Sequence, residues 1–263
     1  MRKGIYYSLL PGNTPEEKFT AAAKYGFQCV EIPTLTTDSD RRLYANAAKE
    51  AGIKIPSVMN QLHWQCPLSD PDPDVRAKSV DGMFQSLETA LACGADTVLL
   101  VPAVVTPKVP YERAWEVSQN EIDKLIPEYE DNKVYIAIEN VGNRFLLSPT
   151  DFVDYIDEFD SRWVAAYFDV GNIVKTGFPE QWITTIGNRL KKIHVKGFDL
   201  KQMVFCSLME EGCSIDWKAV MYALRAVGYD DVMTGELKGK GETPDECMTN
   251  ISTDMDKIFA LLN

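Results

Sequence analysis

Short apolar runs alternate with longer amphipathic segments along the whole chain. The apolar runs predict eight strands, at residues 4–9, 28–32, 54–59, 97–101, 134–138, 164–168, 191–195 and 231–235. The segments between them carry helix signals: Thr14 and Thr243 each precede a proline and can cap a helix start, and Gly26 is suited to a helix end. Eight strand–helix units in 263 residues are typical of a closed (β/α)8 barrel, the TIM barrel.

The alternation continues without a break, which indicates one domain. No linker rich in glycine, serine or proline, no charge block and no low-complexity tract divides the chain, so residues 1–263 are expected to form a single barrel. An open, doubly wound sheet is the competing architecture for such a pattern. Its glycine-rich turn after the first strand is missing, because the chain reads LLPGNTP there. We therefore favour the barrel.

Four of the predicted strands end at a residue that can bind a metal ion. These residues are Glu139 in VYIAIENVGNR, Asp169 in VAAYFDVGN, His194 in LKKIHVKG and Glu236 in DVMTGEL. About one strand–helix unit separates each from the next, and the carboxyl ends of barrel strands converge at one mouth. One such acid alone would more often form a structural salt bridge, but the four together predict a divalent-metal site. Mn²⁺ or Mg²⁺ suits these ligands best, and Co²⁺ or Zn²⁺ could also occupy them.

A cation between two glutamates indicates proton-transfer chemistry. If a ketose chelates the cation through its carbonyl and neighbouring hydroxyl oxygens, an enediolate is stabilised, and Glu139 and Glu236 can remove and return the proton. Return to the same carbon from the opposite face is epimerisation, and return to the adjacent carbon is aldose–ketose isomerisation. The pattern thus favours an isomerase or epimerase of a small ketose or ketose phosphate.

The segments around these residues resemble a known family. IEN…NRFLLSP, YFDVGN and IHVK, together with LSDPDPDVRAKSV and EEGCSIDWKAVMYALRAVGYDDV, are similar to the xylose isomerase-like barrels of the sugar phosphate isomerase/epimerase type, and nearest to the ketose 3-epimerases. The resemblance covers nearly the whole chain. It implies that Glu139, Asp169, His194 and Glu236 bind the metal, and that Glu139 and Glu236 also form the acid–base pair.

The chain departs from this family at positions that bear on the substrate. Tagatose 3-epimerase-like enzymes have a glutamate that binds substrate hydroxyls where this chain has Leu146, and many sugar-phosphate relatives have an aspartate where it has Gly197. The tagatose 3-epimerase-like enzymes also carry an arginine in the loop after the seventh strand, whereas this loop offers only Lys201. The predicted metal chemistry therefore has more support than any particular substrate.

Four further residues are candidates for substrate binding: His63, Asn143, Asn172 and Lys196. His63 lies in the loop after the third strand, and Asn143 follows the fifth. Asn172 stands where relatives have a histidine or asparagine that contacts substrate, and Lys196 has the inward parity of His194, so it can reach a substrate oxygen or phosphate or pair with a nearby acid. Glu31, at the end of the second strand, is expected to be a buried, hydrogen-bonded acid, and a position directly behind the metal ligands is the alternative.

Net charge, the length of the apolar runs and the cysteine pattern limit the kinds of molecule that this protein can bind. The net charge of −12 repels a nucleic-acid backbone, and no apolar run approaches the roughly 20 residues that span a bilayer, so we expect neither a nucleic-acid nor a membrane partner. The six cysteines form no CxxC pair and are expected to be reduced, as in the cytoplasm. A small sugar or sugar phosphate is the expected ligand, and analogy with relatives suggests a homo-oligomer.

Three other functions are alternatives to an isomerase or epimerase. A lyase similar to inosose dehydratase could use the same metal and base and then expel a β-hydroxyl group. A DNA-repair enzyme similar to endonuclease IV would need a histidine-rich metal site and a basic face, which two histidines and a charge of −12 disfavour. A binding subunit could keep the metal site without turnover. The first and third alternatives stay open.

Overall fold

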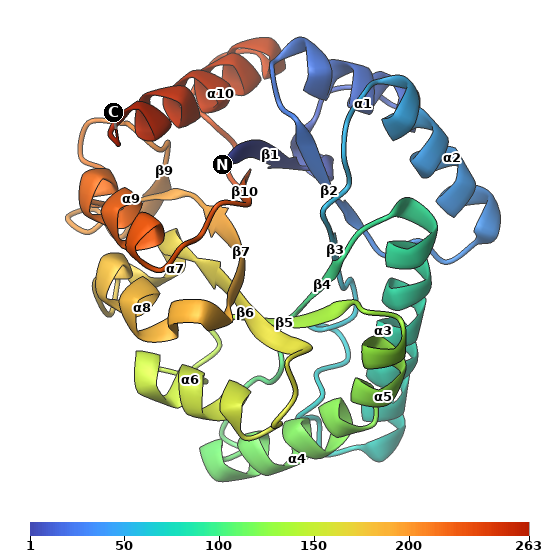
Figure 1. Ribbon diagram of the computed structural model, residues 1–263. Coiled ribbons are helices and arrows are strands. Elements are labelled where there is room, and N and C mark those ends of the chain that lie inside the picture. Colours follow the sequence, from blue (N-terminus) through green and yellow to red (C-terminus); the bar gives the residue numbers. More distant parts are fainter. Residues whose placement is uncertain (263) are drawn as a thin grey trace.

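The computed structural model describes residues 1–262 and forms a closed barrel of eight parallel strands surrounded by helices (Figure 1). The barrel strands are β1 (Arg2–Tyr6), β2 (Cys29–Pro33), β3 (Ser57–Met59), β4 (Thr97–Leu100), β5 (Tyr135–Glu139), β6 (Val164–Asp169), β7 (Leu190–Val195) and β10 (Val232–Gly235). Around the barrel they follow the order β1-β10-β7-β6-β5-β4-β3-β2. The predicted TIM barrel is confirmed, and each strand overlaps an apolar run of the sequence.

The helices follow the strands in turn along the chain. They are α1 (Pro15–Lys24), α2 (Asp38–Glu50), α3 (Pro73–Cys93), α4 (Tyr111–Asp123), α5 (Ile126–Asp131), α6 (Pro149–Asp157), α7 (Val170–Ile173), α8 (Pro179–Ile186), α9 (Trp217–Ala226) and α10 (Pro244–Ala260). Short 3-10 turns occupy Tyr7–Leu9 and Gly187–Arg189. Within residues 1–262, no helix has both the length and the apolar composition that crossing a bilayer requires.

Local sequence signals account for several helix boundaries. The Thr14 hydroxyl accepts a hydrogen bond from the Glu17 backbone N–H, and the Glu17 carboxylate accepts one from the Thr14 N–H, which is the capping box that the sequence predicts for α1. Thr243 caps α10 in the same way. The segment between β4 and β5 forms two helices, α4 and α5, and not one continuous helix. Pro127 lies in the first turn of α5, where its missing N–H and its ring prevent α4 from continuing.

The barrel interior holds only a small apolar cluster, whereas the layer between strands and helices forms the large apolar core. Val98 and Leu100 of β4 belong to the large apolar core against the helices, whereas Leu99 points the other way into a small cluster with Ala137 and Tyr167. Above this cluster the inward side chains are polar and charged. The site described below is built on this polar layer at the carboxyl ends of the strands.

One element of the fold was not predicted from the sequence. After β7 the chain forms a two-stranded antiparallel hairpin, β8 (Gly197–Asp199) with β9 (Val204–Cys206). Phe205 and Met203 of this hairpin are about half exposed. The hairpin rises beside the barrel mouth and forms one wall of the cavity there.

Candidate metal centre

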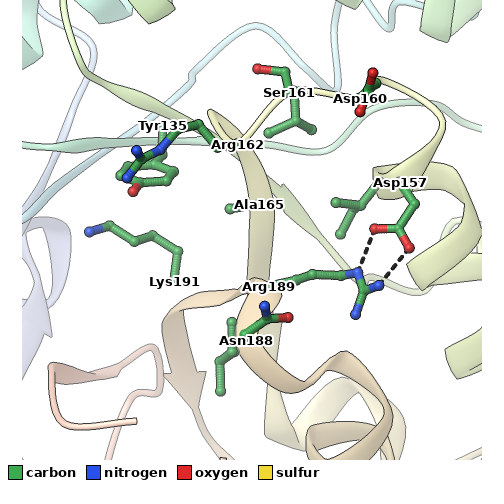
Figure 2. Close-up of a pocket in the computed structure, with 12 residues that line it drawn as sticks. Tyr135, Asp157, Asp160, Ser161, Arg162, Ala165, Asn188, Arg189 and Lys191 are labelled. Carbon is green, nitrogen blue, oxygen red and sulfur yellow. Dashed lines mark hydrogen bonds and ion pairs between the residues drawn. The ribbon is translucent and has the colours of Figure 1, made fainter. Parts of the chain in front are cut away.

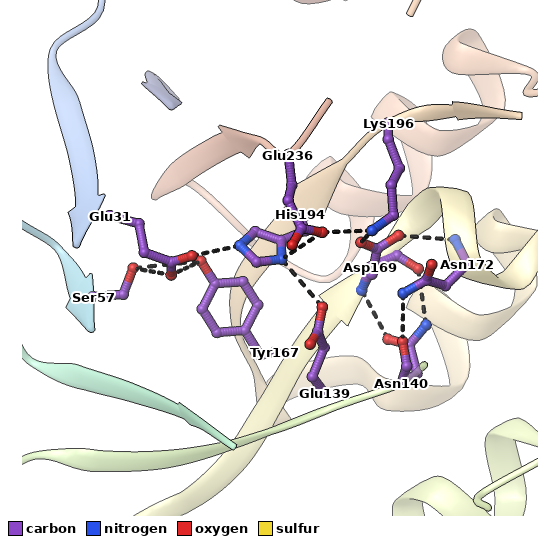
Figure 3. A network of polar contacts seen from close by, with 10 residues as sticks. All are labelled: Glu31, Ser57, Glu139, Asn140, Tyr167, Asp169, Asn172, His194, Lys196 and Glu236. Atoms are coloured by element: carbon purple, nitrogen blue, oxygen red, sulfur yellow. Dashed lines mark hydrogen bonds and ion pairs between the residues drawn. The ribbon is translucent and has the colours of Figure 1, made fainter. Parts of the chain in front are cut away.

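The side chains of Glu139, Asp169, His194 and Glu236 converge at the carboxyl ends of the strands (Figure 3). Each offers one ligand atom, and these four atoms all lie within 4.8 Å of one another. Asp169 at the end of β6 is paired in register with His194 of β7, and Glu139 ends β5. Glu236 follows β10 directly and is the only one of the four that is not buried. The structure thus brings together the four residues that the strand-end pattern singled out.

The imidazole of His194 lies between two sets of carboxylates. Its Nδ1 atom is 3.1 Å from Oε1 of Glu139 and 3.6 Å from Oε2 of Glu236. Its Nε2 atom is 2.7 Å from Oε1 of Glu31, which comes from β2 on the other side of the barrel. The second oxygen of Glu31 accepts hydrogen bonds from Ser57 and Tyr167, each 2.6 Å long. Glu31 therefore fixes the ring so that Nδ1 faces the carboxylate cluster.

Asp169 is held by backbone contacts of the neighbouring loop. Asn140 accepts a hydrogen bond from the Asp169 N–H at 2.8 Å and donates one to the Asp169 carbonyl at 2.9 Å. Oδ1 of Asp169 accepts from the Asn172 N–H at 2.8 Å, so it caps α7. The other oxygen, Oδ2, is buried, and within the described residues its partner is Lys196 Nζ, which lies 2.9 Å away. A cation at the cluster would share this oxygen with the lysine.

Burial and neighbouring carboxylates disfavour the charged forms of Glu139 and Asp169 in this cluster. Burial raises the pKa of Glu139 to about 7, and Glu236 and Asp169 add to this effect while His194 opposes it. Burial also raises the pKa of Asp169. Burial opposes the charge on His194, but Glu31 and Glu236 hold its pKa well above the ordinary value. The cluster therefore favours an added positive charge.

The donor set fits a hard divalent cation. Three carboxylates and one imidazole are the ligands that Mn²⁺ and Mg²⁺ accept, and the four ligand atoms lie within 4.8 Å of one another. Lys196 now supplies part of the positive charge, since its Nζ lies 2.5 Å from Glu236 and 2.9 Å from Asp169. A cation bound by the four residues would share these carboxylates with the lysine.

A cavity of about 630 Å³ opens above the cluster. Glu139 and Glu236 form its floor, and Trp64, Phe198 and Phe205 are among the apolar residues that line it. Parallel barrels place reactive groups at this end, and the volume lies in the range of small-molecule binding sites.

Three of the four candidates for substrate binding line this cavity: His63, Asn172 and Lys196. His63 is buried, its Nδ1 has no hydrogen-bond partner within the described chain, and burial lowers its pKa to about 4, so the ring is neutral. Asn172 donates to the Asn140 carbonyl at 3.0 Å. Asn143 does not line the cavity; its amide donates to the Ala103 carbonyl and accepts from the Phe145 N–H. We therefore assign Asn143 to loop anchoring and leave it out of the substrate site proposed below.

Glu31 and the hairpin after β7 also contribute to the site. Glu31 is buried and hydrogen-bonded, as expected, and its contact with His194 corresponds to the alternative position directly behind a metal ligand. The carboxylate at the end of the second strand was the available signal, because strand ends converge. The hairpin residues Phe198, Met203 and Phe205 had no such signal, since three-residue strands give too short a pattern to detect.

A second cavity, of about 800 Å³, lies at the opposite end of the barrel beside the starts of β6 and β7 (Figure 2). Two of its basic side chains are paired with acids: Arg189 forms two hydrogen bonds with Asp157, and Lys191 is 2.7 Å from Asp96. Lys191 also lies over the ring of Tyr135. Paired ions at the amino ends of barrel strands serve stability, so we assign no ligand to this cavity.

Comparison with known proteins agrees with the fold. The family described as xylose isomerase-like TIM barrel matches residues 19–256. L-ribulose-5-phosphate 3-epimerase UlaE of Escherichia coli (strain K12) is 24% identical over 238 residues, which cover 86% of this chain and 83% of that protein.

Solved structures of epimerases share the fold at lower identity. D-psicose 3-epimerase from Clostridium cellulolyticum H10, with D-tagatose, superposes with a TM-score of 0.81 at 18% identity, over 100% of both chains. 3-Keto-D-glucoside 4-epimerase, YcjR, from E. coli gives 0.82 at 16% identity, over 99% of both chains. The resemblance found in the sequence is confirmed: this chain belongs to the xylose isomerase-like TIM barrel family.

Proposed function

We propose that this protein is a divalent-metal-dependent epimerase of a small ketose or ketose phosphate, similar to the ketose 3-epimerases. The observation that carries the proposal is the position of two glutamates on non-adjacent strands around one buried imidazole. Nδ1 of His194 lies 3.1 Å from Glu139 and 3.6 Å from Glu236, and both glutamates face the same 630 Å³ cavity. The relatives named above, which are epimerases of ketoses, a ketose phosphate and a keto-glucoside, support the same reaction class.

Glu139, Asp169, His194 and Glu236 would hold the cation, with Mn²⁺ or Mg²⁺ as the proposed ion. When bound, the cation polarises a ketose carbonyl and so makes the neighbouring C–H more acidic. Glu139 and Glu236 reach the cavity from β5 and from the end of β10, with β6 and β7 between them in the barrel. One glutamate removes the proton and the other returns it from the opposite face, which inverts that carbon.

Other residues of the cavity orient the sugar. The unpartnered Nδ1 of His63 offers a hydrogen bond to a hydroxyl group, and a neutral imidazole adds no charge to the site. Asn172 and Lys196 present an amide and an ammonium group at the opposite wall. Trp64 and Phe205 exclude water from the sugar faces.

Solvent deuterium uptake tests the proposal. The metal-loaded protein is incubated in D₂O with a panel of free and phosphorylated ketoses, and label at the carbon next to the carbonyl is measured by mass spectrometry. We expect uptake that a chelator removes and that Glu139→Gln or Glu236→Gln lowers by about 10²- to 10⁴-fold. Glu112→Gln, an exposed change on α4, is the matched control.

The same assay separates the alternatives. Elimination by a lyase would give a product that absorbs ultraviolet light, whereas epimerisation would not. Tight metal binding with no uptake from any ketose would contradict the proposal and favour a binding subunit. Label on the adjacent carbon would instead indicate aldose–ketose isomerisation.

A further inference from the structure

A cavity of about 800 Å³ adjoins the proposed substrate cavity on the side of β10. The two cavities share Lys196, Phe205 and Glu236, so they meet at the metal cluster. The cavity on the β10 side is lined by the loop after β10, residues 237–241, which reads LKGKG. Ser8, from the 3-10 turn after β1, also lines it. A molecule bound at the cluster can therefore extend one end into this second cavity.

The loop after β10 offers unused backbone donors. Across residues 1–262, the N–H groups of residues 237–241 donate no hydrogen bond, although every one of these residues lines the cavity. The carbonyl groups of the same loop face α10 instead: Lys240 O accepts from Asn250 at 2.7 Å, and Gly239 O and Gly241 O accept from the Cys247 thiol. Successive free N–H groups in a glycine-rich loop form a binding place for an anion.

Positive charge gathers at this loop although the protein as a whole carries −12. Lys238 forms no ion pair with any described residue, and the contact of Lys240 with Glu210 is a long 3.5 Å. Lys196 lies on the same wall, paired with Glu236 at 2.5 Å. Lys238 and Lys240 are both exposed and can turn toward a bound anion.

The loop conformation depends on its glycines. Gly239 and Gly241 have φ angles of 72° and 155°, which disfavour other residues. A Cβ on Gly241 would lie 2.7 Å from Glu246 Cβ and 2.8 Å from the Cys247 N atom. Only glycine allows the loop to turn so close to α10 with its N–H groups left free.

We propose that the cavity beside the loop after β10 binds a phosphate ester at the far end of the substrate, so that the enzyme prefers ketose phosphates to free ketoses. The inference rests on the proposed function, because it assigns the other end of the same molecule. A phosphate dianion can accept several N–H donors and pair with Lys238 and Lys240 at once, whereas a free hydroxyl group gains little from them. The metal cluster binds the keto end, and the loop after β10 selects the charged end.

The test compares ribulose with ribulose 5-phosphate in the metal-loaded protein by deuterium exchange. We expect kcat/KM to be higher for the phosphate. In the double variant Lys238→Ala/Lys240→Ala, the ratio of the two kcat/KM values should fall by about 10- to 100-fold, since each lysine loses a charge-assisted contact. Lys78→Ala/Lys218→Ala removes two exposed lysines from α3 and α9 and should keep the wild-type ratio.

Binding of inorganic phosphate gives a readout that does not depend on turnover. Calorimetry on the metal-loaded protein should detect phosphate binding that weakens by a similar factor in Lys238→Ala/Lys240→Ala but not in the control. If neither sugar exchanges deuterium, the proposed function fails for ribulose, and this measurement alone decides the anion site. Equal kcat/KM for both sugars, or phosphate binding that is unchanged in the lysine variant, would overturn the inference.

Discussion

Glu31 and His194 are joined across the inside of the barrel, with Nε2 of the imidazole 2.7 Å from Oε1 of the carboxylate and both side chains fully buried. They are 163 residues apart in the chain. This contact leaves Nδ1 of His194 facing Glu139 and Glu236. The orientation of the proposed metal ligand is therefore set by a residue outside the cluster.

We predict that Glu31→Gln weakens Mn²⁺ binding by about 10- to 100-fold, as measured by calorimetry. Glutamine has a similar shape but lacks the charge, and its amide N–H₂ would meet the hydroxyl donors of Ser57 and Tyr167. Ser57→Ala removes only one of these donors and should have a smaller effect. Wild-type affinity in Glu31→Gln would show that His194 needs no orienting carboxylate.

Removal of metal should lower the melting temperature. A ligand that binds only the folded state at about 100 times its Kd adds about 2.7 kcal/mol to stability, and a chelator takes this away. In Asp169→Asn the Mn²⁺-dependent shift in Tm should vanish, because one of the four clustered ligands loses its charged carboxylate. Asp131→Asn, an exposed change at the end of α5, should keep the shift in scanning calorimetry. An intact shift in Asp169→Asn would remove this residue from the ligand set.

Gly171→Ala should destabilise the protein by about 1–3 kcal/mol, because the added Cβ overpacks the contact between α7 and β7. It would lie 2.5 Å from Lys196 Cγ and 2.6 Å from the Lys196 carbonyl oxygen, and the carbonyl cannot move without disturbing the chain after β7. Gly142→Ala meets no atom within 4 Å and serves as the control for urea unfolding. Equal urea midpoints for Gly171→Ala and Gly142→Ala would contradict the prediction, because the chain around Lys196 would then accommodate the added Cβ without cost.

Asp96→Asn should reduce stability at neutral pH but not in strong acid. Burial opposes its charge, yet Lys192 and Lys191 outweigh this and lower the pKa of Asp96 to about 2. A lowered pKa in the folded state adds stability above the ordinary value near 4, and this gain is lost as the pH falls toward 2. The side chain is 48% exposed, so screening by solvent limits the loss in Asp96→Asn to about 1 kcal/mol.

Urea unfolding in the presence of a chelator checks the prediction for Asp96. The difference in free energy of unfolding between wild type and Asp96→Asn should be constant from pH 7 to about 5 and should shrink below about 4. Asp160 is exposed at the same end of the barrel and forms no ion pair with any residue from 1 to 262, so Asp160→Asn should show no such trend. A difference that persists at the lowest pH would point to packing and not to charge.

The sequence by itself determined the barrel and the four clustered residues. Apolar runs of period two, helix caps such as Thr14 and glycine stops such as Gly26 are local signals, and local signals locate strands and helices. Parallel barrel strands end at one mouth. Glu139 and Asp169, which end β5 and β6, and Glu236, which follows β10, are therefore expected to meet near His194 of β7. The convergence of strand ends is therefore enough to predict that Glu139 and Glu236 lie near each other.

The tertiary structure alone decided how the side chains are used. Asn143 looked available after β5, but its amide bonds the Ala103 carbonyl across two loops. Glu31 reaches His194, and the loop of residues 237–241 leaves its N–H groups free because its carbonyls face α10. Each outcome depends on atoms distant in the chain that compete for one hydrogen-bonding group. A linear pattern lists such groups, but only the packed chain determines which partner each one reaches.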